Sequence, residues 1–305
     1  MIDVVCVASW NADLVSHVPR PIARGETVLA SSFEIGPGGK GSNAAVAAAR
    51  QGAKVAVIAR IGTDDFGRMA LDIWHREGIE TRHVEQARGE RSGVAQIHVY
   101  DGGDNSIAVF LGAGGALGPA NVAGARETIA GARVVMAPCE VPLAATTAAF
   151  RVARERGVTT LLNPAPAQPL TDELIALCDV LTPNEGELRA LAGVDESVSV
   201  DVAAQRLLAR GAGTVLATLG EAGCRLFRRD VEPLALPGWT VEVADTVGAG
   251  DTCTGALAAA LARGLALPEA ARFANAAAAL SVTGHGAITA MPDRAAVERL
   301  LATRP

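Results

Sequence analysis

The sequence lacks the features of a nucleic-acid-binding protein. It has no dense run of lysine and arginine, and the formal net charge of its 305 residues is −6. A protein that binds nucleic acid normally presents a basic patch. We therefore expect a small-molecule partner and no nucleic acid.

Cysteine pairs, membrane spans and export signals are also missing. The five cysteines occur singly, without a C-x-x-C pair, so the sequence predicts neither a disulfide framework nor a zinc site. No apolar run reaches the roughly 18 residues of a membrane span. The N-terminus has no positively charged segment with a cleavage site. We therefore expect a cytoplasmic protein without a membrane partner.

Three common catalytic patterns are absent. The five histidines are dispersed without metal-ligand spacing, and no Gly-x-Ser-x-Gly elbow suggests a serine hydrolase. The loop GPGGKGSN, residues 36–43, is not a Walker A loop, because Gly41 follows Lys40 and Glu34 stands where the first glycine should be.

The sequence does contain the pattern of an α/β protein. Half of its residues are apolar, enough for a substantial core. Continuous apolar runs, typical of buried parallel strands, alternate with Ala-rich segments that end in Gly, a common helix stop. The predicted strands are 3–8, 54–59, 133–137, 158–162, 179–182 and 213–218, and the clearest helical segments are 42–52, 142–157 and 201–211. We expect a mostly parallel sheet covered on both faces.

Two regions interrupt this alternation. Residues 9–37 are rich in turn formers, and within residues 92–111 two strand-like runs flank the turn DGGDN, which predicts a β-hairpin. We expect these regions to form a small sheet that projects from a single domain, residues 1–305, and covers a ligand.

The stretch DTVGAGDT, residues 245–252, predicts an anion site. The first N–H groups of a helix lack partners and carry partial positive charge, and glycines at 248 and 250 allow a phosphate to approach the backbone. Asp251 would lie beside that phosphate, where it could take a proton from an attacking hydroxyl. The alternative is that Asp251 only caps the helix.

Other polar residues follow predicted strands, at the edge where α/β sheets bind ligands. Asn11 and Asp13 could hydrogen-bond the hydroxyls of a sugar, or form a turn. Asn184 and Glu187 have a spacing compatible with hydrated magnesium, or with a helix start. Lys40 is one of only two lysines and could meet an anion, or be solvated on a glycine-rich turn. The turn TLGEAG, residues 218–223, is compatible with nucleotide contacts.

Taken in order, seven segments resemble the ribokinase family of sugar kinases. They are NAD at 11–13, GGKGSN at 38–43, GTDDFG at 62–67, NPAPA at 163–167, TPNEGE at 182–187, TLG at 218–220 and DTVGAGDT at 245–252. The resemblance implies a three-layer α/β sandwich with a β-sheet lid that is also a homodimer interface. It also implies transfer of the γ-phosphate of ATP to a sugar CH2OH, with Mg²⁺ and possible activation by K⁺.

The resemblance also implies roles for individual residues. Asp251 would be the catalytic base, and the amides of Gly248, Ala249 and Gly250 the anion hole. Sugar contacts would come from Asn11, Asp13, Gly39, Lys40, Asn43, Glu140, Asp245 and Asp251. Nucleotide contacts would come from Asn184, Thr218, Gly220, Gly223, Gly250 and Asn275. Glu187 would act on Mg²⁺ indirectly, and Asp245 would lie near a K⁺ site.

Three departures from the family pattern leave the exact sugar and the cation open. Ala44 replaces a common Gln, LGAGG at 111–115 lacks the usual Asn, and Ala290 stands where a Ser often helps to hold K⁺. We expect phosphorylation of the 5-hydroxyl of D-ribose. The alternatives are another pentose, a ketohexose or a nucleoside, although 3% aromatic residues offer little stacking for a base. A non-catalytic sugar- or nucleotide-binding regulator is a further alternative.

Overall fold

The computed structural model describes residues 1–303 and contains one large and one small β-sheet. The large sheet has nine strands, in the order β13 (Val231–Leu236), β12 (Cys224–Arg228), β11 (Thr214–Thr218), β10 (Val180–Leu181), β9 (Thr159–Asn163), β8 (Val134–Pro138), β1 (Val4–Val7), β4 (Val55–Gly62) and β5 (Glu80–Ala87). Neighbouring strands pair in parallel except at β12, which runs antiparallel to both β11 and β13. All six strands predicted from apolar runs are present.

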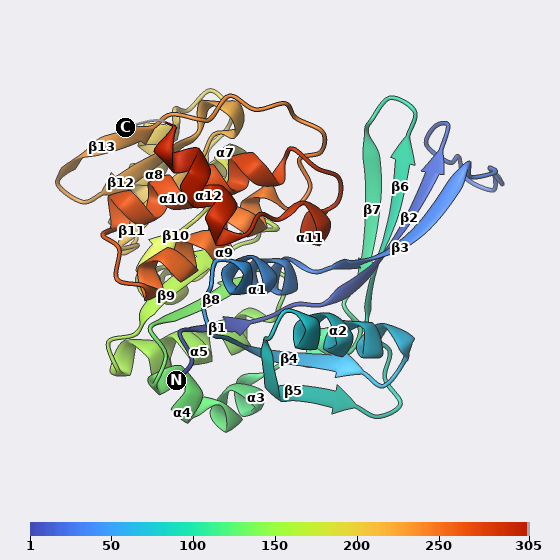
Figure 1. Ribbon diagram of the computed structural model, residues 1–305, viewed down its shortest axis with the longest axis horizontal. Coiled ribbons are helices and arrows are strands. Elements are labelled where there is room, and N and C mark those ends of the chain that lie inside the picture. Colours follow the sequence, from blue (N-terminus) through green and yellow to red (C-terminus); the bar gives the residue numbers. More distant parts are fainter. Residues whose placement is uncertain (304–305) are drawn as a thin grey trace.

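Helices cover both faces of this sheet (Figure 1). Successive side chains of a strand point to opposite faces, so Val4 and Cys6 of β1 enter one apolar core and Val5 and Val7 the other. The first core is closed by α1 (Lys40–Arg50), α2 (Asp65–Arg76), α9 (Ala249–Ala262), α10 (Leu267–Ser281) and α12 (Arg294–Ala302). The second is closed by α3 (Pro119–Gly124), α4 (Arg126–Ala130), α5 (Leu143–Glu155), α6 (Asp172–Ala176), α7 (Glu185–Ala192) and α8 (Val200–Ala209). The predicted three-layer α/β fold is confirmed.

The small sheet is built from the two regions that interrupt the alternation. Its strand order is β3 (Ser32–Gly38), β2 (Asn11–Val18), β6 (Gly93–Tyr100) and β7 (Asn105–Phe110), with β2 and β6 parallel. It projects to the right of the main body in Figure 1. The predicted hairpin is present as β6 and β7. β2 follows β1 directly and β3 leads into α1, so the small sheet joins the large one at the end where β1 and β4 terminate.

The predicted helix stops also agree with the structure. Gly52, Gly157 and Gly211 follow α1, α5 and α8, and each has a positive φ, which favours glycine. One boundary differs, because α1 begins at Lys40, inside the glycine-rich loop. Short helical turns complete the chain: η1 (Gly112–Ala116), η2 (Gly220–Ala222) and α11 (Ala287–Ala290). Among residues 1–303, no helix combines the length and the apolar character that crossing a membrane requires.

Candidate active site

At the start of helix α9, two backbone N–H groups have no acceptor among residues 1–303. Gly248 is its N-cap, in the left-handed conformation with φ of 78°. The N–H of Ala249 reaches the Thr246 carbonyl only at 3.3 Å, and within residues 1–303 the N–H groups of Gly250 and Asp251 have no acceptor. A side chain added at Gly250 would meet open space. This helix start can therefore hold an anion.

Asp251 lies in the first turn of this helix and does not cap it. The residue is 5% exposed, and its carboxylate accepts hydrogen bonds from the side-chain amides of Asn43, at 2.9 Å, and Asn163, at 3.4 Å. The alternative that Asp251 is a helix cap is therefore wrong. Burial raises the pKa of Asp251 to about 6, against the opposing effects of Lys40 and the Asn43 hydrogen bond. The group can exchange a proton near neutral pH.

The start of α1 is tied to Glu140, which follows β8. One Glu140 carboxylate oxygen accepts the hydroxyl of Ser9 at 2.7 Å and the backbone N–H of Lys40 at 2.8 Å. The Ser9 hydroxyl oxygen in turn accepts the Gly41 N–H at 2.9 Å. A Cβ on Gly41 would lie 2.6 Å from Ala8 Cα, so only glycine lets the helix start this close to the end of β1. Glu140 thus fixes the start of α1 beside the end of the large sheet.

Lys40 lies among acidic side chains. It is half-buried, and burial alone would lower its pKa, but the carboxylates of Asp251, Glu140, Glu187 and Asp13 raise the pKa above its ordinary value. Lys40 therefore stays charged, and it is the first residue of α1, not part of a free turn. A charged ammonium beside the α9 start suits an anionic ligand.

Asp13 and Asn11 share one face of β2, since they are two residues apart in a strand. The alternative of a turn at this point is wrong. Burial, with a contribution from Glu140, raises the pKa of Asp13 to about 7. A Cβ on Gly38, the residue before Gly39, would lie 2.0 Å from an Asp13 carboxylate oxygen. Gly39 has φ of 90°, and its own Cβ would lie 2.8 Å from Trp10 Cα. The glycine pair therefore lets the Asp13 carboxylate lie directly over the loop that precedes Lys40.

The candidate nucleotide residues come together next to this site. Asn184 pairs with Thr218 in an isolated parallel bridge. Asn184 and Glu187 form a capping box at the start of α7: the Glu187 N–H donates to the Asn184 side chain at 2.8 Å, and the Asn184 N–H donates to the Glu187 carboxylate at 2.9 Å. The helix-start interpretation of this pair is therefore right, and it does not use all the acceptor sites of the Glu187 carboxylate.

The remaining nucleotide candidates border one loop. Gly220 begins the short turn η2 after β11, and Gly223 follows it. A Cβ on Gly223 would lie 2.2 Å from the Leu236 carbonyl oxygen, so this glycine packs against the end of β13. Asn275 of α10 donates to the carbonyl of Pro237, the next residue, at 2.9 Å. The segments 220–223 and 237–238 and the side chain of Asn275 thus pack against one another.

Asp245 links two loops at the start of α9. Its carboxylate accepts the N–H of Val247 at 3.0 Å and that of Gly286 at 2.8 Å. The side chain of Ala287 packs close to Gly248. Within residues 1–303 no group of three or more His, Cys, Asp or Glu side chains could hold a metal ion. A divalent cation at this site would therefore need ligands from a bound molecule or from water.

Sequence reasoning gave no role to two residues that lie in the site. Ser9 joins Glu140 to the start of α1, and Asn163 donates to Asp251. Both directly follow or end apolar strand runs, β1 and β9, at the edge where the other candidates lie. Their position after a strand was the available signal.

Comparisons with known proteins agree on one family. The profile described as pfkB family carbohydrate kinase matches residues 1–294. The ribokinase of Haemophilus influenzae is 40% identical over 290 residues, 94% of either chain. A deoxyribokinase of Salmonella typhi is 35% identical over 294 residues, 95% of this chain and 96% of its own. A structure of Arabidopsis thaliana ribokinase complexed with ribose and ATP superimposes with a TM-score of 0.91 and 31% identity, covering 98% of both chains.

Proposed function

This chain belongs to the pfkB family of carbohydrate kinases, and from that membership we propose that it transfers the γ-phosphate of ATP to the 5-hydroxyl of D-ribose. The resemblance drawn from the sequence motifs is confirmed at the level of the family and of an ATP-dependent sugar kinase. The observation that carries the proposal is the buried Asp251 carboxylate beside the N–H groups of Gly250 and Asp251, which have no acceptor in residues 1–303.

In this mechanism Asp251 is the general base. It takes the proton of the sugar hydroxyl as the oxygen attacks the γ-phosphorus, and the N–H groups at the start of α9 stabilise the charge on the phosphoryl oxygens. Asn43 and Asn163 hold the carboxylate in place by donating to it. Phosphoryl transfer depends mainly on positioning and electrostatic stabilisation, which a fixed carboxylate at a helix start supplies.

The proposed sugar contacts come from β2, from the start of α1 with the glycine before it, and from Glu140 after β8. Asn11 and Asp13 of β2 meet the sugar hydroxyls, Gly39 lets the backbone approach, and Asn43 faces the sugar from α1. The Asn43 side-chain oxygen is buried without a partner in residues 1–303, which supports a ligand hydroxyl as its donor. Lys40 and Glu140 complete the polar wall of the site.

The nucleotide contacts proposed are those that border the 220–223 turn. ATP would contact Asn184, Thr218, Gly220, Gly223, Gly250 and Asn275, and the packing of the turn against the 237–238 loop and Asn275 supports this assignment. Mg²⁺ favours waters and phosphate oxygens with one or two carboxylates. The unused acceptor sites of Glu187 fit a water of hydrated Mg²⁺, which when bound neutralises phosphate charge. K⁺ near Asp245 stays a prediction.

The proposal is tested by measuring ADP release with a panel of sugars and nucleosides. We expect kcat/KM for ribose to exceed that for 2-deoxyribose by about 10²-fold or more, because a site built to hydrogen-bond a hydroxyl strongly rejects an analogue without it. Xylose, fructose and adenosine serve as controls for the other acceptor classes.

The other outcomes each identify an alternative. A preference for 2-deoxyribose would favour the second candidate, a deoxyribokinase, which the 35% identity to the Salmonella typhi protein supports. A preference for fructose or adenosine would replace ribose as the substrate. ADP release with none of the acceptors, in a protein that binds sugar or ATP by calorimetry, would point to a non-catalytic regulator.

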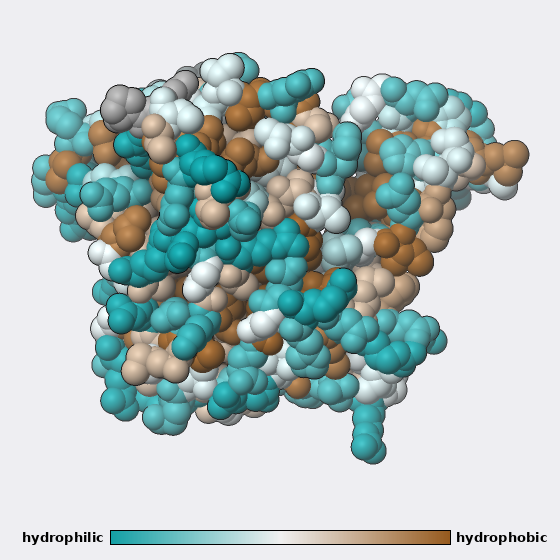
Figure 2. Space-filling model, viewed as in Figure 1, coloured by the Kyte–Doolittle hydropathy of each residue, from teal (hydrophilic) through white to brown (hydrophobic). Residues whose placement is uncertain are grey.

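We also propose that the small sheet is a homodimer interface. Large apolar side chains on one face of it are exposed, including Phe33 at 58%, Ile35 at 50% and Phe110 at 60%, and brown patches mark this sheet in Figure 2. A second copy of the chain would cover them. We expect sedimentation equilibrium to give twice the mass of the chain, and the double variant F33E/F110E to be a monomer. A wild-type monomer at micromolar concentration would contradict the interface.

The cytoplasm remains our proposed location, since ATP is the phosphate donor and all five cysteines are free. Recovery of the protein in a membrane or exported fraction of fractionated cells would contradict it.

A further inference from the structure

The motif GTDDFG, residues 62–67, has no part in the mechanism above. It joins the end of β4 to the start of α2 and lies against residues 88–92, the segment that enters β6 of the small sheet. A Cβ on Gly62 would lie 2.5 Å from the Glu90 carbonyl oxygen, and a Cβ on Gly67 2.1 Å from the Gly62 carbonyl oxygen. Because Gly62 and Gly67 have no side chains, residues 88–92 can pass close to the backbone of the motif.

Asp64, between these glycines, holds that segment by hydrogen bonds. One oxygen of its carboxylate accepts the Ser92 hydroxyl at 2.6 Å and the Gly67 N–H at 3.0 Å, and the other accepts the Ser92 N–H at 3.0 Å. Partial burial would raise the pKa of Asp64, but the bonds from Ser92 and Gly67 outweigh it and lower the pKa. Ser92 is fully buried, and its hydroxyl oxygen accepts the Gly62 N–H at 3.0 Å.

Ser92 stands directly before a residue that touches the proposed sugar site. Gly93 begins β6 and pairs with Asn11 in the parallel register of β2 and β6. A Cβ on Gly93 would lie 2.3 Å from the Asn11 side-chain oxygen and 2.4 Å from the Trp10 carbonyl oxygen. A shift of Ser92 of even a few tenths of an ångström would therefore move the backbone against which the Asn11 amide packs.

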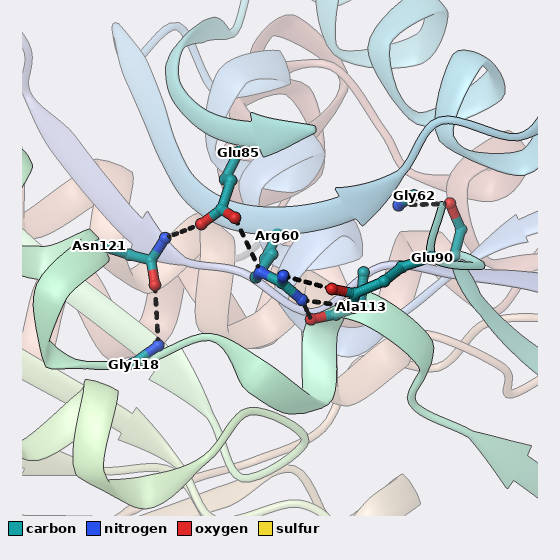
Figure 3. Close-up of polar contacts among 8 residues, drawn as sticks. Arg60, Gly62, Glu85, Glu90, Ala113, Gly118 and Asn121 are labelled. Atoms are coloured by element: carbon teal, nitrogen blue, oxygen red, sulfur yellow. Dashed lines mark hydrogen bonds and ion pairs between the residues drawn. The ribbon is translucent and has the colours of Figure 1, made fainter. Parts of the chain in front are cut away.

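Arg60 binds the chain on both sides of the β6–β7 hairpin, before β6 and after β7 (Figure 3). Arg60 of β4 forms two bonds to Glu90, at 2.7 and 2.6 Å, and donates to the Ala113 carbonyl at 3.0 Å. Glu90 precedes β6 and Ala113 follows β7. The Ala113 N–H donates to the Arg91 carbonyl at 2.8 Å, so the two ends of the hairpin are also joined to each other.

We propose that Asp64 is a positioning residue for the sugar site: through Ser92 and Gly93 it fixes Asn11 and the base of the small sheet relative to the large one. The inference rests on the proposed function, because Asn11 is a sugar contact only there. The GTDDFG motif thus fixes the position of the small sheet, which carries the proposed sugar contacts Asn11 and Asp13, relative to the large sheet. Arg60 provides a second connection between the two sheets.

The decisive variant is Asp64→Asn. Asparagine caps a helix as well as aspartate does, so the Gly67 contact and the start of α2 survive. Its oxygen can keep both the Gly67 N–H and the Ser92 hydroxyl, but its NH2 group then faces the Ser92 N–H and cannot accept it. We expect KM for ribose to rise about tenfold, as for the loss of one charge-assisted hydrogen bond, with KM for ATP within about twofold of wild type.

Asp293→Asn is the matched control. Asp293 also caps a helix, α12, through the Ala296 N–H at 2.8 Å, and within residues 1–303 it makes no hydrogen bond to the small sheet. This variant should keep both KM values. Ser92→Ala, which leaves the cap of α2 untouched, should raise KM for ribose in the same direction and decides the matter if Asp64→Asn does not fold.

These experiments distinguish a failure of this inference from a failure of the proposed function. If wild type phosphorylates ribose but Ser92→Ala and every folded Asp64 variant keep its KM for ribose, Asp64 is only a helix cap. An equal rise of both KM values would also overturn the inference, since it would show a general loss of order. If wild type phosphorylates no sugar, the proposed function fails first, and that result is visible before any variant is made.

Discussion

Replacement of Asp251 by asparagine is expected to lower kcat by about 10²- to 10⁴-fold, the usual contribution of a general base. The amide keeps the volume of the carboxyl group, so KM for ribose and ATP should stay within a few-fold. The melting temperature should change little. Burial raises the pKa of Asp251 to about 6, so removal of the ionised form favours the folded state, but the new NH2 group faces a donating amide of Asn43 or Asn163 and one hydrogen bond is lost. Steady-state kinetics with a thermal melt measures both effects.

The same carboxylate predicts a pH dependence in the wild-type enzyme. A general base acts only when ionised, so kcat/KM should increase as pH rises through about 6. It should level off only above about 7, because the Asp13 carboxylate, whose pKa burial raises to about 7, also contacts the sugar in its ionised form. An Asp251→Asn variant with the turnover number of wild type would remove the base from the mechanism. So would a wild-type rate that stays flat from about pH 5 to about pH 8.

The interior of the fold could be predicted from the sequence because buried parallel strands are continuous apolar runs. β1, β8 and β11 are buried on both faces and were found by that signal. The strand β5, with sequence ETRHVEQA, and the edge strand β13 are half-exposed, so polar residues interrupt them and no apolar run marks them. Their strand conformation depends on pairing with β4 and β12, which the sequence does not reveal.

The sequence predicts which residues belong to the candidate site, but it does not predict which of them contact one another. Asn11, Asp13, Asn184 and Asp251 could be named because each stands near the end of a strand or the start of a helix. The contact of Asn163 with Asp251 joins residues 88 positions apart, and that of Ser9 with Glu140 joins residues 131 positions apart. No local pattern encodes such pairs, because they form only when the sheet brings the strand ends together.

Replacement of Asp13 by alanine should raise KM for ribose roughly 10²-fold, the order expected when two charge-assisted hydrogen bonds to sugar hydroxyls are lost. KM for ATP should change little, because the proposed nucleotide contacts lie on other segments. The matched control is Glu34→Ala, which removes an exposed acid from β3 of the same sheet and should leave both constants unchanged.

Calorimetry with ribose alone separates sugar binding from catalysis in the Asp13→Ala variant. Loss of the carboxylate also removes one negative neighbour of Lys40, whose pKa Asp13 helps to raise. The ammonium keeps Asp251, Glu140 and Glu187 as acidic neighbours, so it should stay charged and available to an anionic ligand. A fall in ribose affinity with ATP affinity retained is therefore the expected pair of results. An unchanged ribose affinity would mean that Asp13 does not contact the sugar.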